Sequence, residues 1–180
     1  MLIKENTGLV VIDIQGKLSK IVHQSELLIS NTARLIKGVQ ALDLPVLWLE
    51  QNPQKLGPTA PELSDILAPD NKPIPKYTFD ACKEPLFIKA LQNSNISTWL
   101  ICGIETHICV YQTAMGLVNT GFDVELVSDC VSSRSAINKQ LAISKLASKG
   151  VGITSLEMCL YELASDCRAV EFKQILGLTK

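Results

Sequence analysis

Three side chains in this sequence have the chemistry to attack a carbonyl carbon together: a thiol, a carboxylate and an ammonium group. The thiol is Cys109 in the segment GIETHIC, the carboxylate is Asp13 in VVIDIQ, and the ammonium group is Lys76 in PKYTFDA. A thiolate is a strong nucleophile, a carboxylate accepts the thiol proton, and a nearby ammonium group stabilises the thiolate. If the three side chains meet, the chemistry that they favour is hydrolysis through a covalent intermediate on Cys109.

The position of Cys109 strengthens this hypothesis. A helix is expected over residues 107–119, ended by Thr120 and Gly121. If Thr106 caps it, Cys109 lies in the first turn, where unpaired amides and the helix dipole lower the thiol pKa and can hold an oxyanion. A nearby Lys76 would lower that pKa further.

The residues also have an unremarkable interpretation. Cys109 is then a packed cysteine, Asp13 a strand-end cap and Lys76 a solvated surface charge. Residue spacing alone leaves this alternative open.

The elements that must position these residues alternate along the chain. Strands are expected at 8–14, 45–49, 97–102, 122–127 and 151–154, and helices at 25–42, 85–92, 107–119, 135–148, 156–164 and 170–176. This alternation predicts an α/β fold, a three-layer Rossmann-like arrangement with a central, mainly parallel sheet of five or six strands and helices on both faces. The length of 180 residues suits one domain over 1–180.

Ligands of open parallel sheets bind beyond the carboxyl ends of the strands. Asp13 closes the first expected strand, the segment that contains Cys109 follows the third, and residues 128–130 follow the fourth. Lys76 ends a proline-rich connection, 50–77, which is either a lid or a rigid surface loop. The fold can therefore bring the three candidates to one cleft.

Composition narrows the class of protein. Seventeen Lys and Arg residues against eighteen Asp and Glu residues give a net charge of -1, so no nucleic-acid or membrane partner is expected. The apolar run at the N-terminus is short and contains Asp13, so we expect neither a signal peptide nor a membrane span, and a cytoplasmic location. Six cysteines without a CxxC pair should stay reduced there.

The three motifs, in this order, resemble the Asp, Lys and Cys motifs of the isochorismatase-like (cysteine hydrolase) superfamily. DCVSSRS at 129–135 resembles a further family segment, and the likeness runs from about Gly8 to Leu163. The proline-rich segment LEQNPQKLGPTAPEL is most similar to that of uncharacterised isochorismatase domain-containing hydrolases.

The resemblance implies a role for each motif. Cys109 would attack an amide, ureido or similar carbonyl carbon, Asp13 would act as general base and then acid, and Lys76 would stabilise the thiolate. It also implies a cis peptide between Ile104 and Glu105, with an oxyanion hole formed by the backbone of Ile104, Glu105 and Cys109. The partner would be a small-molecule substrate, and the protein a homo-oligomer, a dimer or larger.

Residues near the motifs are candidates for the substrate pocket: Gln15, Gln51, Tyr77, Phe79 and His107. We expect no cofactor and no metal, because the metal-binding relatives carry a histidine after the second strand and this chain has only His23 and His107. This argues against nicotinamidase activity. Isochorismate hydrolysis is not favoured either, because it needs only an acid and such relatives typically lack the cysteine.

Two alternatives to a metal-independent hydrolase of C–N bonds remain open. One is a catalytically silent protein that keeps the fold as a scaffold or interaction module. The other is a thiol redox sensor, in which Cys130 resolves an oxidised Cys109.

Overall fold

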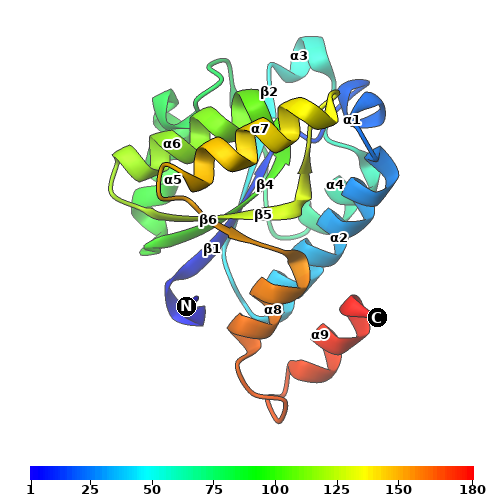
Figure 1. The fold of residues 1–180 in the computed structure, drawn as a ribbon, viewed down its shortest axis with the longest axis vertical. Coiled ribbons are helices and arrows are strands. Elements are labelled where there is room, and N and C mark those ends of the chain that lie inside the picture. The colour runs from blue at the N-terminus through cyan, green and yellow to red at the C-terminus, as the bar shows by residue number, and fades with distance from the viewer.

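The computed structural model describes all 180 residues and has a six-stranded parallel sheet between two layers of helices (Figure 1). The strands are β1 (Thr7–Ile12), β2 (Val46–Gln51), β3 (Ile74–Lys76), β4 (Thr98–Ile104), β5 (Asp123–Ser132) and β6 (Gly152–Thr154). Their order is β3-β2-β1-β4-β5-β6, and every neighbouring pair is parallel. The predicted α/β fold is confirmed, and the sixth strand is β3, inside the proline-rich connection.

Each face of the sheet is covered by its own group of helices. One group is α2 (Ser25–Ala41), α4 (Pro61–Leu67), α8 (Leu156–Ala164) and α9 (Phe172–Thr179); the other is α5 (Pro85–Ser94), α6 (Tyr111–Asn119) and α7 (Ala136–Ala147). The short helices α1 (Leu18–Ile21) and α3 (Pro53–Leu56) lie in connections. None of these helices combines the length and the hydrophobicity that a membrane span requires.

The two layers explain the apolar run of β1. Leu9 and Val11 pack into the core on one face, whereas Val10 and Ile12 pack into the core on the other. All four side chains are fully buried. A central parallel strand is covered on both sides, so its sequence does not alternate between apolar and polar residues.

The order of the strands reverses around β1. The chain adds β2 and β3 on one side of β1 and then crosses to β4 on the other. At such a switch point the connections leave the sheet in opposite directions and open a crevice beyond the carboxyl ends of the two strands. Asp13 directly follows β1 and Glu105 directly follows β4, so both lie at this crevice.

Close contact between β1 and β4 at this edge requires a glycine. Gly103 pairs with Ile12, and its φ of +135° lies in a region that favours glycine. A Cβ atom on Gly103 would lie 2.1 Å from the carbonyl oxygen of Ile12. The glycine therefore allows the two site-bearing strands to stay paired up to their carboxyl ends.

The middle of the proline-rich connection is hydrogen-bonded to the segment that follows β1. Gln15 and Thr59 form an isolated antiparallel bridge, and the Ala60 N–H donates to the Ile14 carbonyl over 2.9 Å. The buried Glu50 carboxylate accepts from both the backbone N–H and the hydroxyl of Thr59, at 2.7 and 2.8 Å. Of the two expected possibilities, these contacts favour a rigid loop over a lid.

Two local predictions are wrong. Residues 128–130 lie inside β5, because that strand continues to Ser132 through an irregularity in its pairing with β4. Thr106 does not cap a regular α-helix. It begins a π-helical segment, Thr106–Val110, that leads into α6, and its buried hydroxyl has no hydrogen-bond partner.

Candidate active site

The Lys76 ammonium group lies at the centre of the site. Its side chain is fully buried, although it is charged, and its Nζ atom is 2.8 Å from Asp13 Oδ2. The same atom donates to Gln51 Oε1 over 2.5 Å and to the Thr78 carbonyl over 3.2 Å. A lysine ammonium group has three protons, and two of them are used in these hydrogen bonds, which leaves one for the ion pair with Asp13.

Asp13 lies immediately after β1 with a φ of +54°, which turns the chain away from the sheet. Its carboxylate is 3% exposed, is paired with the Lys76 charge, and has no hydrogen-bond partner at either oxygen. Burial raises the pKa of this carboxyl group, and the Lys76 charge opposes that rise without cancelling it. The result is a carboxylate that accepts a proton more readily than an exposed aspartate does.

Cys109 lies in the π-helical segment, with its thiol against the Asp13 carboxylate and the Lys76 ammonium group. Burial raises the thiol pKa to about 12; the Asp13 charge adds to this rise and the Lys76 charge opposes it. The expected lowering of the Cys109 pKa is therefore wrong for the resting protein. The main reason is that the thiol is buried, and the Asp13 charge next to it adds to the rise in pKa.

The segment between β4 and Cys109 is held by a buried carboxylate. Glu105 Oε1 accepts from the backbone N–H of Arg134 over 3.0 Å and from Arg134 Nε over 3.1 Å. The peptide bond between Ile104 and Glu105 is cis, as the resemblance implies. The Glu105 N–H itself has no acceptor within the protein.

The structure separates the five pocket candidates. Tyr77 and Phe79, directly beyond Lys76, are 62% and 53% exposed, and so remain free to meet a ligand. His107 instead contacts Ser133 Oγ through Nδ1 at 3.0 Å and approaches the Asn138 amide at 3.5 Å.

Gln15 and Gln51 are also engaged within the protein. The Gln15 amide is bound to backbone atoms of Gln51 and Gly57. The Gln51 side chain accepts a hydrogen bond from Lys76 and donates one to the Tyr77 carbonyl. These contacts give both amides a role within the protein, and substrate binding by either one stays a prediction.

Two contributions to the site were not anticipated. Lys76 donates to the backbone carbonyl of Thr78. Every residue has such a carbonyl, so this contact could not be predicted from the residue type. Arg134 belongs to the DCVSSRS segment, and the arginine in that motif was the available signal for its contact with Glu105.

Cys130 does not share the site with Cys109. Cys130 is fully buried in the core that contains Leu9 and Val11, whereas Cys109 belongs to the core on the opposite face of the sheet. All six cysteines are free thiols. The sheet lies between the two sulfurs, which argues against the redox-sensor alternative.

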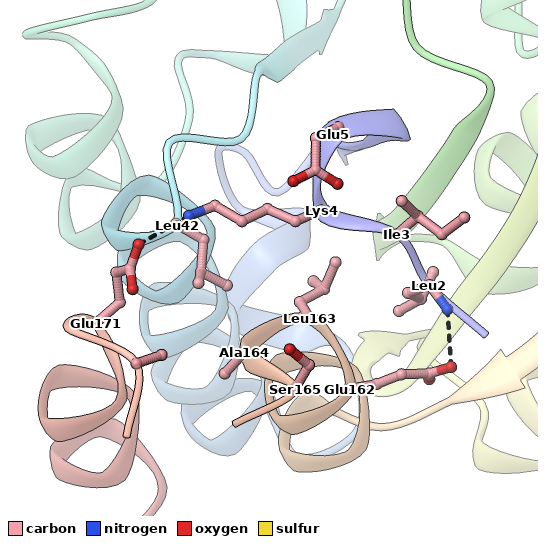
Figure 2. A pocket seen from close by; sticks show the side chains of 11 residues that line it. Leu2, Ile3, Lys4, Glu5, Leu42, Glu162, Leu163, Ala164, Ser165 and Glu171 are labelled. Atoms are coloured by element: carbon pink, nitrogen blue, oxygen red, sulfur yellow. Dashed lines mark hydrogen bonds and ion pairs between the residues drawn. The ribbon is translucent and has the colours of Figure 1, made fainter. Parts of the chain in front are cut away.

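No group of three or more His, Cys, Asp or Glu side chains is arranged to hold a metal ion. A surface hollow of about 370 Å³ is lined by Leu2 to Glu5 and by the segments around Glu162 and Glu171 (Figure 2). It lies beside the start of β1, at the opposite end of that strand from Asp13. Two of its lining residues, Lys4 and Glu171, form an ion pair of 2.8 Å (Figure 2).

Comparison with known proteins identifies the family. The isochorismatase domain model matches residues 7–158. The chain belongs to the isochorismatase family. Among its isochorismatase relatives, the secreted isochorismatase effector Isc1 of Phytophthora sojae is 35% identical over 99% of this chain and 87% of its own length. Isochorismatase domain-containing protein 2 of Danio rerio is 34% identical over 94% of this chain and 85% of its own length.

Solved structures share the isochorismatase fold. The MAR1 ribonuclease of Caenorhabditis elegans has a TM-score of 0.92 and 31% identity, covering 99% of this chain and 91% of that one. The YcaC gene product of Escherichia coli, described as an octameric hydrolase of unknown specificity, has a TM-score of 0.92 and 22% identity, covering 98% and 89%. The first is similar to this chain in both sequence and fold, and the second supports the fold alone.

Proposed function

We propose that this isochorismatase-family protein is a metal-independent cysteine hydrolase that cleaves an amide, ureido or similar C–N bond of a small molecule. The observation that carries the proposal is the fully buried Lys76–Asp13 ion pair, 2.8 Å long, against the Cys109 thiol. Burying two charges is costly unless they are paired. A catalytic role gives a reason to keep a thiol beside this pair.

The first step is proton transfer from the Cys109 thiol to Asp13. The raised pKa of Asp13 makes its carboxylate the better base for this transfer. Once Asp13 is protonated, it no longer neutralises Lys76. The ammonium charge then stabilises the new thiolate, which explains how a thiol with a pKa of about 12 at rest can react.

The second step is attack of the thiolate on the carbonyl carbon. A carbon–sulfur bond forms, and the carbonyl electrons move to oxygen. We assign the oxyanion to backbone N–H groups of the 104–109 turn, among which the Glu105 N–H has no acceptor at rest. The C–N bond then breaks, the departing nitrogen takes the proton from Asp13, and a thioester remains on Cys109.

The third step is hydrolysis of the thioester. Asp13 accepts a proton from water while the water oxygen attacks the thioester carbon. The carbon–sulfur bond breaks, and the sulfur recovers the proton from Asp13. The resting thiol, carboxylate and ammonium group are restored without any cofactor.

We further propose that the protein works in the cytoplasm as a homo-oligomer on a small molecule, without a nucleic-acid or membrane partner. Six free thiols suit a reducing compartment. The octameric description of the Escherichia coli protein of the same fold favours assembly.

The test is a screen of small amides and ureides in which the release of ammonia or an amine is measured. Cys109→Ala, Asp13→Asn and Lys76→Met should each abolish release from any substrate found. A thioester adduct on Cys109 should be detectable by mass spectrometry after rapid acid quenching. Turnover that survives in Cys109→Ala would rule out the covalent mechanism.

A further inference from the structure

We propose that Gln51 is a positioning residue for this site, fixing the direction of the Lys76 ammonium group, and that Gln15 in turn fixes Gln51. This inference rests on the proposed function, because it concerns how the proton-accepting pair is held. Neither glutamine needs to touch a substrate for this role.

The strand order places Gln51 where it can position Lys76. Lys76 lies on β3 and Asp13 follows β1, so the lysine side chain must extend over β2. Strands in a sheet are about 4.8 Å apart, so the Lys76 and Asp13 side chains, with the 2.8 Å contact between them, together span two such spacings. Gln51 is the residue of β2 that pairs in register with Lys76. Its side chain is therefore next to the lysine along this path.

The orientation of the Gln51 amide is determined by its two partners. The ammonium group can only donate, so Oε1 must face Lys76 Nζ, at 2.5 Å. The Tyr77 carbonyl can only accept, so Nε2 must face that oxygen, at 2.9 Å. Gln51 thus connects the ammonium group to the backbone just beyond it.

Gln15 fixes the backbone of Gln51 in the same way. Its Oε1 accepts from the Gln51 N–H over 2.7 Å, and its Nε2 donates to the Gln51 carbonyl over 2.9 Å. The second Nε2 proton goes to the Gly57 carbonyl over 2.7 Å. Gln15 is 1% exposed, and all these amide positions are occupied by backbone partners. This arrangement ties β2 to the proline-rich connection.

The chemical consequence concerns the third proton of the ammonium group. With Gln51 and the Thr78 carbonyl holding two protons, one proton remains for Asp13. Loss of the Gln51 oxygen would free a proton to turn toward Asp13, which would make that carboxylate a weaker base for the thiol proton. Gln51 thereby controls how strongly the Lys76 charge lowers the pKa of the Asp13 carboxyl group.

The experiment measures alkylation of Cys109 and needs no substrate. Limiting iodoacetamide is applied from pH 4 to 10, and each cysteine is mapped by mass spectrometry. In the unsubstituted protein we expect a rise as Asp13 loses its proton, a plateau, and a second rise toward the thiol pKa of about 12. In Asp13→Asn only the second rise should remain.

Two substitutions at Gln51 test the inference. Gln51→Glu places a second carboxylate on Lys76, so the first rise should move to higher pH by about one unit. Gln51→Met removes a hydrogen bond to a charged group, so plateau reactivity should fall about tenfold. Gln40→Met is the matched control, because Gln40, on α2, donates to the Ile66 carbonyl on α4, away from the site, and its profile should stay within about twofold.

Thermal unfolding of each variant separates positioning from folding. If Gln51→Glu is folded and its first rise does not move, the positioning role is wrong. If Gln51→Met does not fold, the near-isosteric Gln51→Glu still decides the matter. If Asp13→Asn keeps the first rise, the proposed function fails first, and the two failures are distinguishable.

Discussion

Lys76 reaches Asp13 across an intervening strand: Nζ lies 2.8 Å from Oδ2 although β2 separates β3 from β1. The two side chains are 0% and 3% exposed. Removing one member of such a buried pair leaves an unpaired charge, at a cost of about 3–5 kcal/mol. The pair is therefore both the chemical centre of the site and a point where a single substitution affects folding.

Lys76→Met should destabilise the protein in a pH-dependent way. Without the ammonium group, the folded-state pKa of Asp13 rises further above its unfolded value near 4. A group with a raised folded pKa contributes stability below its unfolded pKa, and loses it as the pH rises through the folded pKa. We expect a loss of about 3–5 kcal/mol at pH 8 and a smaller loss at pH 5, measured by urea unfolding.

Lys89→Met is the control for that measurement, because Lys89 is an exposed lysine on α5. Its change in unfolding free energy should stay within about 0.5 kcal/mol at both pH values. Equal losses at pH 5 and pH 8 in Lys76→Met would show that Asp13 protonation does not compensate the missing charge.

Cys109→Ala should abolish turnover while the fold survives. The side chain is small and 7% exposed, so losing its sulfur should change the free energy of unfolding by about 1 kcal/mol or less. Circular dichroism and urea unfolding report the fold, and product release reports the activity. Cys159→Ala, at a fully buried cysteine of the other core, should instead lower stability and keep activity.

Gly103→Ala should be strongly destabilising. The new Cβ atom would lie 2.1 Å from the Ile12 carbonyl oxygen, at a backbone φ of +135°. The combined steric and backbone strain should lower the unfolding free energy by about 3 kcal/mol or more. Gly177→Ala on α9 is the comparison, because a Cβ atom there meets nothing within 4 Å. Similar melting temperatures for the two variants would contradict the tight β1–β4 pairing.

Mild peroxide should not link Cys109 to Cys130. The two thiols belong to cores on opposite faces of the sheet, and a disulfide requires Cα atoms within about 7 Å with converging side chains. Non-reducing peptide mapping should find Cys109 reduced or carrying oxygen, and exposed Cys167 as the more readily oxidised thiol. A Cys109–Cys130 peptide from folded protein would restore the redox-sensor alternative.

The sequence was most informative where a pattern repeats. The apolar runs of β1 and β4 predicted their strands, and the rule for carboxyl ends selected Asp13 and the segment leading to Cys109. β3 was missed because three residues show no period and include Pro75, which an edge strand tolerates.

Properties that depend on tertiary contacts were beyond the sequence. The thiol pKa of Cys109 follows from its burial and from the pairing of Lys76 with Asp13. The roles of Gln15 and Gln51 follow from hydrogen bonds to backbone atoms, which residue types do not encode. The helical pattern around Cys109 likewise did not reveal the π-helical segment.

The ion pair also bears on substrate choice. The resting thiol, carboxylate and ammonium group sum to zero formal charge, and moving the thiol proton to Asp13 leaves that sum at zero. An anionic or cationic substrate would therefore find no net counter-charge among Asp13, Lys76 and Cys109. Shape and hydrogen bonding, rather than Coulomb attraction, would then decide what these three residues accept, and turnover of a neutral substrate would vary little with ionic strength.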